Sequence, residues 1–178
     1  MPHIPLSEEL PGITGAFAFR PETARPMRAL AEALLRGPNT LTSAEREMIA
    51  AFVSSRNECD FCWASHRAAA AHHLNGDYAA VDAVCEAAAK APISAKLRAL
   101  LDIAAQVQQS GRNVTPNAIA SARAEGATDL EIHDTVLIAA AFCMFNRYVD
   151  GLATVPASPE QYDAMGARMA HQGYQGAR

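Results

Sequence analysis

Apolar residues recur along most of the chain at spacings of three and four positions, which is the period of an α-helix. The longest such segment is 129–150, whose inward positions are Ile132, Val136, Ala139, Phe142 and Cys143. No segment alternates between apolar and polar residues over a useful length, as a strand would. We therefore predict an all-α fold, an antiparallel bundle of about seven to eight helices joined by short loops.

Capping and turn residues predict where each helix begins and ends. Thr42 with Glu45 forms a capping box, as does Thr128 with Glu131, so Glu45 already has a structural role. The helices predicted in this way are 27–36, 43–55, 59–75, 78–90, 95–110, 116–125, 129–150 and 159–170.

The two ends of the chain differ from this helical core. Residues 1–21 contain four prolines, a density that forbids a long helix, so we expect an extended arm lying on the body or on a neighbouring subunit. A helical core over 22–155 follows, and then a C-terminal helix and tail over 156–178, frayed after Gly173. The 178 residues suit one domain.

Composition narrows the class of protein. Half of the residues are apolar, but many are alanine, and Ala-rich helices bury little area each, so a partner subunit is expected to complete the core. The net charge of -4 has no basic block, which argues against a nucleic-acid partner. The longest apolar run, 136–145, is too short to span a bilayer, and we identify no secretion signal. We therefore expect a cytoplasmic protein, where a CxxC pair favours redox or metal chemistry.

The candidate chemistry is concentrated in the segment from Cys59 to His66. On a helix, with 100° between successive residues, Cys59, Cys62 and His66 share one face. Glu47, twelve residues before Cys59, lies on a stripe of small residues in the preceding helix. Small residues let another helix approach closely, so this carboxylate is expected between two helices, or in solvent as for most helical glutamates.

These four groups suit peroxide reduction by a thiolate. A helix N-terminus and a nearby imidazolium both favour the thiolate, and His66 follows Cys62 by one helical turn. Glu47 can orient His66 or relay its proton. A thiolate that attacks a peroxide becomes a sulfenic acid, which the second thiol converts to a disulfide. The helix dipole favours Cys59 as the attacking group, because Cys59 is nearer the N-terminus of the helix. The proton relay favours Cys62, because Cys62 is nearer His66.

Other interpretations of the same residues remain open. A zinc site is one, although His3, His72, His73 and His133 show no paired ligand spacing. A lactone decarboxylase that uses Glu47 and His66 as acid and base, without the thiols, is a second. A redox sensor or disulfide-exchange partner with negligible peroxide turnover is a third.

Two further features of the sequence have simpler explanations. Cys85 and Cys143 lie on apolar helical stripes, and we expect both in the core. Asn146-Arg147 interrupts the apolar run of the long helix. This pair either returns the helix to solvent or forms hydrogen bonds to another helix or subunit.

The spacing of Glu47, Ser54, Asn57 and the Cys59-x-x-Cys62-x-x-x-His66 motif resembles the AhpD-like family of the carboxymuconolactone decarboxylase superfamily. The stretch 145–152, Phe-Asn-Arg-Tyr-Val-Asp-Gly-Leu, is similar to its peroxidase-related branch. The resemblance covers about residues 25 to 155. It implies an all-helical subunit assembled into dimers, trimers or hexamers, with alkylhydroperoxidase activity.

The resemblance also implies a role for each motif residue. Cys62 would attack the peroxide, and Cys59 would react with the resulting sulfenic acid to form the disulfide. His66 with Glu47 would relay the proton. The implied partners are a hydroperoxide substrate and a dithiol or thiol-protein electron donor, and no haem, flavin or metal is implied. Phe61 departs from the family, because well-studied AhpD proteins have a second histidine there. The motif also lies in the first half of the chain, unlike in AhpD itself.

Overall fold

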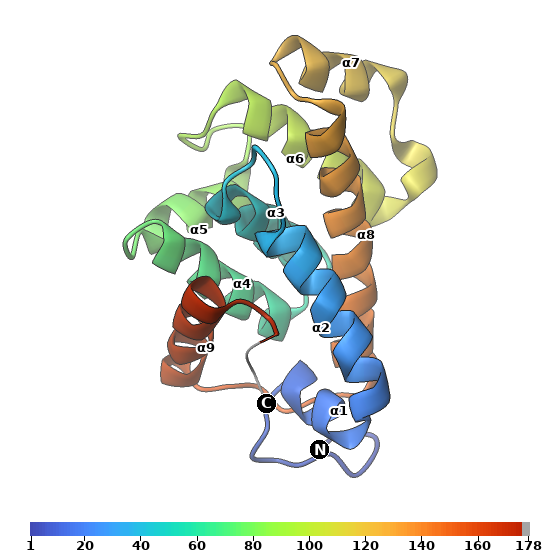
Figure 1. Cartoon of the computed structure of the whole chain (residues 1–178), viewed down its shortest axis with the longest axis vertical. Helices are drawn as coiled ribbons and strands as arrows, with labels where there is room; N and C mark the ends of the chain where they lie inside the picture. The colour runs from blue at the N-terminus through green and yellow to red at the C-terminus, as the bar shows by residue number, and fades with distance from the viewer. Residues whose placement is uncertain (176–178) are drawn as a thin grey trace.

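Helices form all the regular secondary structure in residues 1–175, the part of the chain that the computed structural model describes (Figure 1). The prediction of an all-α bundle is therefore confirmed. The elements are α1 (Ile13–Phe19), α2 (Pro21–Arg36), α3 (Ser43–Arg56), α4 (Asp60–His73), α5 (Tyr78–Ala87), α6 (Ala95–Gln109), the 3-10 turn η1 (Gly111–Asn113), α7 (Pro116–Ala124), α8 (Asp129–Gly151) and α9 (Pro159–Gln172).

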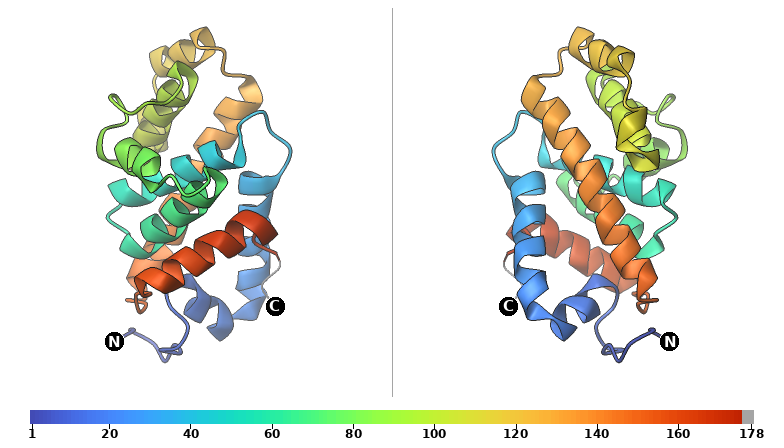
Figure 2. Two further views of the ribbon diagram at one scale, coloured as in Figure 1. Left: turned by 90° about the vertical axis from the view of Figure 1, so that its left-hand side faces the viewer. Right: turned by 90° about the vertical axis from the view of Figure 1, so that its right-hand side faces the viewer.

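The pair α3 and α4 is the centre of the fold and also holds the predicted motif. Both helices are made largely of small and apolar residues, so they approach closely and bury most of their length. The long helix α8 packs against α3 and α6, while α9 lies across α4. Figure 2 shows α8 and α9 on opposite sides of the molecule, with α3 and α4 between them. The larger of two clusters of buried apolar side chains includes Leu35, Ile49, Val53, Leu100 and Ile138, and the smaller one consists of Cys59, Phe61, Cys62 and Val149.

The N-terminal arm is extended only in its first part, which corrects the prediction for residues 1–21. Residues 13–19 form α1, because Pro11 and Pro21 flank this segment and no proline lies within it. The arm lies on the body of the same chain. The His3 amide donates to the Leu152 carbonyl at 3.0 Å, and the Gly12 amide donates to the Val155 carbonyl at 2.9 Å.

The next helix begins earlier than predicted. Pro21 is the first residue of α2, a position that suits proline because the amide there needs no helical partner. Pro26, predicted to start the helix, lies inside it. It is exposed, so water can reach the backbone around the hydrogen bond that proline removes.

Two glycines allow helices to approach the motif closely. A Cβ atom at Gly166 of α9 would lie 2.4 Å from Cβ of Ala68 on α4, so only glycine permits this crossing. Gly12 has φ +56 and lies against the ring of Phe61, where a side chain would overlap the ring. The N-terminal segment at Gly12 and the helix α9 are therefore both packed onto α4.

The chain turns back on itself after α9. Gly173 has φ +69, and the Tyr174 amide then donates to a Glu32 carboxylate oxygen at 2.6 Å. Tyr174 is thus packed against α2, which corrects the prediction that the chain frays directly after Gly173. The rest of that prediction concerns residues 176–178, which lie outside the described residues. Within residues 1–175, no helix is long and apolar enough to cross a membrane.

Candidate active site

Glu47 lies at the centre of the site and is fully buried. The local sequence explains its position, since Glu45 caps the start of α3 and Glu47 follows on the side that faces α4. A carboxylate without exposure must be paired, because burying an isolated charge is very costly. Of the two alternatives for Glu47, the position between helices is therefore correct and the position in solvent is wrong.

Three side chains from three different segments bind the Glu47 carboxylate. Oε2 lies 2.7 Å from Nδ1 of His66 on α4. Oε1 accepts hydrogen bonds from Nη2 of Arg36 at the end of α2 and from the Tyr174 hydroxyl, each at 2.6 Å. Burial alone would raise the pKa of Glu47, but the ion pair and hydrogen bond with His66, followed by Arg36 and Tyr174, lower it to about 2.

This arrangement fixes which nitrogen of His66 holds a proton. Ionised Glu47 can only accept, so Nδ1 of His66 must donate and Nε2 is left for other partners. The ring is also held by packing, because it meets the Phe142 ring edge-on with the centroids 4.5 Å apart. The Tyr174 hydroxyl lies 3.3 Å from Nδ1, and burial followed by the charge of Glu47 raises the Tyr174 pKa well above its usual value. Tyr174 therefore stays protonated and donates to Glu47.

Arg36 and Tyr174 were not among the residues predicted for the site. Arg36 is the last residue of a helix, where a cation commonly stabilises the helix dipole, so the sequence offered an adequate local explanation for it. Tyr174 comes after the last helix, in a segment without periodicity. Only the reversal of the chain at Gly173 brings it to Glu47.

Cys59 does not lie on the helix, which corrects the prediction that both cysteines and His66 share one helical face. It is the N-cap residue of α4 with extended backbone angles, and the preceding Glu58 has φ +57. Its side chain is fully buried, and its Sγ lies 4.0 Å from the carbonyl oxygen of Asn146. The hydrogen bond with Cys62 and then burial raise the pKa of Cys59 far above its usual value. Cys59 is therefore held as a neutral thiol beside Cys62.

Cys62 and His66 line a cavity of about 1420 Å³. Side chains from α1, α2, α4, α8 and α9, together with Tyr174, form its walls. Cys62 is 4% exposed and Cys59 is not among the lining residues. All four cysteines are free thiols, so the motif is in its reduced form. The two cysteines of the motif thus face different surroundings, an open cavity for Cys62 and closed packing for Cys59.

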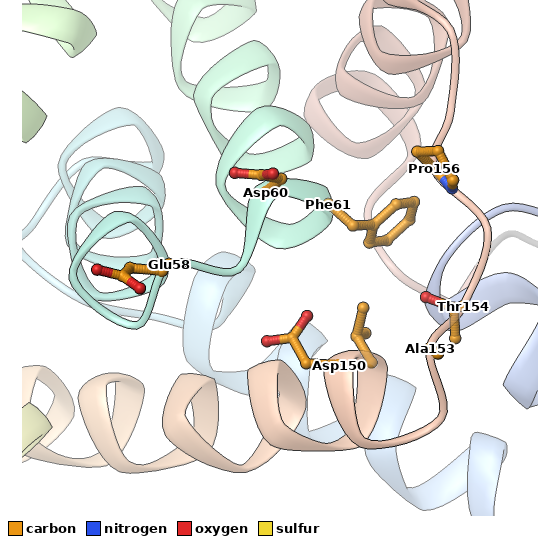
Figure 3. Close-up of a pocket in the computed structure, with 8 residues that line it drawn as sticks. Glu58, Asp60, Phe61, Asp150, Ala153, Thr154 and Pro156 are labelled. Atoms are coloured by element: carbon orange, nitrogen blue, oxygen red, sulfur yellow. The ribbon is translucent and has the colours of Figure 1, made fainter. Parts of the chain in front are cut away.

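A smaller pocket of about 280 Å³ lies on the other side of Phe61, which contributes to the walls of both pockets. Figure 3 shows that its lining comes from the turn before α4, the start of α4, the end of α8 and the loop that follows. Three carboxylates surround it, those of Glu58, Asp60 and Asp150. Phe61 therefore separates the apolar cavity at Cys62 from an acidic pocket.

A buried network of amides holds the turn that contains Cys59. Asn146 of α8 donates to Oγ of Ser54 at 3.1 Å and accepts from Nδ2 of Asn57 at 2.7 Å. Gln108 of α6 donates to Oδ1 of Asn57 at 2.8 Å. Of the two interpretations of Asn146-Arg147, hydrogen bonding to another helix is correct for Asn146, whereas Arg147 is exposed.

The other candidate residues lie outside this site. Cys85 and Cys143 pack against the core but are half-buried, so the prediction that both lie in the core is only partly correct. Burial raises the pKa of Cys85 to about 11, which keeps it inert. Among residues 1–175, no three His, Cys, Asp or Glu side chains are placed to hold a metal ion together, so the zinc interpretation gains no support.

Comparison with known proteins gives matches of two kinds. The model of the carboxymuconolactone decarboxylase family matches residues 21–74, the segment that contains Glu47 and the motif. An uncharacterized peroxidase-related protein from Silicibacter sp. TM1040 has a similar structure, with TM-score 0.78 and 28% identity over 92% of this chain and 91% of that one. No curated protein matches the sequence.

Two further solved structures are similar. One, from Ralstonia eutropha JMP134, is described as an alkylhydroperoxidase AhpD core and an uncharacterized peroxidase-related protein. It gives TM-score 0.79 and 29% identity over 88% of this chain and 81% of that one. A protein of unknown function from Agrobacterium tumefaciens, ATU0492, gives TM-score 0.70 over 80% of this chain and 96% of that one. Its identity of 19% supports the shared fold alone.

Proposed function

The chain belongs to the carboxymuconolactone decarboxylase superfamily, in its AhpD-like branch, and from this premise we propose that it is a thiol-dependent peroxidase. It reduces hydroperoxides at Cys62 and forms a disulfide with Cys59. The observation that best supports this proposal is the buried Glu47–His66 pair beside a cavity that Cys62 lines.

In the first step, Nε2 of His66 accepts the Cys62 proton, and ionised Glu47 stabilises the imidazolium through Nδ1. The thiolate attacks the terminal oxygen of the hydroperoxide, so an S–O bond forms and the O–O bond breaks. Cys62 becomes a sulfenic acid, and the alkoxide leaves with the proton from His66 as an alcohol.

In the second step, the Cys59 sulfur attacks the Cys62 sulfur, the S–S bond forms and the S–O bond breaks. The hydroxide that leaves takes up the Cys59 proton and becomes water. An external dithiol then reduces the disulfide by two thiol–disulfide exchanges and is itself oxidised to a disulfide. The balance is one hydroperoxide and one dithiol converted to an alcohol, water and one disulfide.

Two features support Cys62 rather than Cys59 as the attacking group. Cys62 faces the cavity through which a peroxide can arrive, whereas Cys59 is fully buried. The raised pKa of Cys59 keeps it a neutral thiol, which is a much poorer nucleophile than a thiolate. The helix dipole favoured Cys59 on the assumption that it lies in the first turn of the helix, but Cys59 precedes α4 as its N-cap residue.

Tyr174 supplies a hydroxyl to the proton relay, which lacks the second histidine that AhpD proteins have at the position of Phe61. Phe61 replaces a histidine of that family and packs against Gly12 and Tyr162, so it has no role in proton transfer. The Tyr174 hydroxyl contacts both Glu47 and His66 and lines the cavity. We propose that this hydroxyl stabilises the negative charge of Glu47 while Cys62 attacks the peroxide.

We also place this reaction in the cytoplasm and in a homo-oligomer. The reducing cytoplasm supplies the dithiol that resets the disulfide. Leu130, Leu137 and Met144 of α8 are exposed and seven residues apart, so they lie along one face of the helix. This spacing suits packing against a helix of another subunit.

The test is the loss of the attacking thiol. Cys62→Ser is assayed for consumption of cumene hydroperoxide with dithiothreitol as reductant, and Cys85→Ser is the matched control because Cys85 lies outside the site. We expect turnover to fall to background in the first variant and to stay at the wild-type rate in the second. Wild-type turnover by Cys62→Ser would refute the mechanism.

A lactone decarboxylase is the second candidate, favoured by the family model that covers Glu47 and His66. Such an enzyme needs an acid and a base but no thiol. A protein with both Cys59 and Cys62 changed to Ser should then keep decarboxylase activity on a carboxymuconolactone. A disulfide-exchange partner without turnover would instead form a stable mixed disulfide in the Cys59→Ser protein.

A further inference from the structure

The cavity at Cys62 is much larger than a small peroxide requires. Pockets that bind drug-sized molecules have volumes of about 300–1,000 Å³. The volume here is about 1420 Å³, yet hydrogen peroxide needs only the space around one sulfur atom. The size of the cavity points to a substrate with a long or bulky organic group.

The walls of the cavity are apolar and adaptable. They include Ile13 and Phe17 from α1, Met27 from α2, Phe145 from α8, and Met165 and Met169 from α9. The lining contains three methionines, Met27, Met165 and Met169, whose flexible thioethers adjust to chains of varied shape. Such walls favour a flexible hydrocarbon rather than a polar or sugar-like group.

The charged residues of the lining are mostly arginines. Arg25 and Arg168 are exposed, and the guanidinium of Arg28 lies over the Phe17 ring, 5.2 Å from its centroid. The one acidic side chain among the lining residues of the described chain is Glu22. The whole protein has a net charge of -4, so this local excess of cations is opposite in sign to its surroundings.

From these features we propose that the substrate is the hydroperoxide of a long-chain fatty acid in its free, ionised form. The proposal rests on the peroxidase function proposed above. The hydrocarbon chain lies along the methionine-rich walls, and the hydroperoxide group reaches Cys62 and His66. The carboxylate binds at an exposed arginine of the lining, Arg25 on α2 or Arg168 on α9, because a planar guanidinium group suits bidentate binding of a carboxylate.

The experiment compares four hydroperoxides below their micelle concentrations: linoleic acid hydroperoxide, its methyl ester, cumene hydroperoxide and hydrogen peroxide. We expect kcat/KM for the free acid to exceed that for the methyl ester by about tenfold, the loss typical of one charged hydrogen-bonding partner. Free-acid hydroperoxides of decreasing chain length should give decreasing kcat/KM. Equal values for acid and ester would overturn the proposal, even if every peroxide is consumed.

The variants Arg25→Gln and Arg168→Gln, separately and together, test the arginines. They should lower kcat/KM for the free acid toward that of the ester and leave cumene hydroperoxide unchanged. Arg112→Gln, an exposed arginine in η1 away from the cavity, is the matched control. Loss of the preference for the acid in the control as well would also overturn the proposal.

A binding measurement separates the two proposals. Binding of the unreactive hydroxy acid, which is the product, to the protein and to its arginine variants is measured by isothermal titration calorimetry. Arginine-dependent binding without turnover of any hydroperoxide would support the site for fatty acids and refute the peroxidase function. Turnover of cumene hydroperoxide without binding of the hydroxy acid would retain the peroxidase and refute this substrate.

Discussion

The surroundings of Cys59 and those of Cys62 differ although three positions separate the two residues. Cys62 lies on a helix and lines the large cavity, one turn before a histidine whose other nitrogen is fixed by a buried carboxylate. Cys59 lies on a turn, closed off by apolar packing and by the backbone of α8. A CxxC spacing therefore sets the distance between two sulfurs but not their roles. Access to the cavity and hydrogen bonding decide which cysteine attacks and which forms the disulfide with it.

The largest effect that sharpens this comparison is expected for Cys59→Ser. Steady-state turnover should be lost, because the sulfenic acid on Cys62 cannot be resolved. The first equivalent of peroxide should still be consumed at the wild-type rate, and a sulfenic-acid reagent such as dimedone should label Cys62. Stopped-flow measurement of peroxide loss checks this outcome. A first turnover as slow as in Cys62→Ser would assign the attack to Cys59 instead.

Next in size is the effect of Glu47→Gln on peroxide turnover. Removing the group that stabilises the His66 imidazolium should slow attack by Cys62 about 10²–10³-fold, as is typical for loss of acid–base assistance. Glu45→Gln is the matched control, since glutamine also serves in a capping box. A loss below tenfold would remove Glu47 from the relay.

The same pair of variants tests the pH dependence of stability. Because the pKa of Glu47 is lowered to about 2 in the folded protein, its ionised form stabilises the fold above pH ~4.5. That contribution, on the order of 3 kcal/mol, should disappear as the pH falls from ~4.5 toward ~2. The free energy of unfolding is measured in urea at a series of pH values. Between pH ~4.5 and ~2 it should depend less on pH for Glu47→Gln than for the wild type or Glu45→Gln. Equal slopes would contradict the pairing of Glu47.

A smaller effect is expected for Tyr174→Phe. The variant keeps the ring and removes the hydroxyl that donates to Glu47, so peroxide attack should slow by about tenfold, the cost of one hydrogen bond to a charged group. The pH profile of kcat should shift, because the Glu47–His66 pair loses one of its partners. A loss of stability with no change in this profile would assign Tyr174 to packing alone. Tyr148→Phe, on α8 and not among the cavity-lining residues, is the control.

The smallest effect on chemistry is expected for Asn146→Ala, which acts on the Cys59 side. It removes the hydrogen bonds of Asn146 to Nδ2 of Asn57 and Oγ of Ser54, which should cost about 1–3 kcal/mol of stability. Formation of the disulfide should slow by a few fold while peroxide attack on Cys62 stays unchanged, as rapid-quench thiol counting can measure. Equal slowing of both steps would show that the two sides are not independent. Arg147→Gln, at the exposed neighbouring position, is the control.

Most of the fold could be predicted from the sequence, because helix ends depend on local chemistry. Both capping boxes occur as predicted, and the helical period located α3 to α9 to within a few residues. The start of α2 was missed because a second proline, Pro26, suggested a helix that begins at Met27, six residues too late. The helix α1 was missed because the proline density of residues 1–21 was taken to exclude a long helix, although no proline lies within 13–19.

The candidate site could be predicted only where its members are close in sequence. The motif and Glu47 were found because they lie on adjacent helices, and small residues around Glu47 indicated close packing. Arg36 and Tyr174 complete the carboxylate's hydrogen bonds from segments 11 and 127 positions away. Arg36 is close in sequence but was missed because its position at a helix end already accounted for it, and no local pattern reports a contact as distant in sequence as that of Tyr174.

The sequence by itself determined that this is an all-helical protein with two thiols, a histidine and a carboxylate within one helical hairpin. It did so because helical period and capping depend on residues a few positions apart. The tertiary structure decided which thiol faces the cavity, which groups hold Glu47 ionised and where the arginines lie. Those properties depend on burial and on partners from distant segments, and burial arises only when the helices pack together.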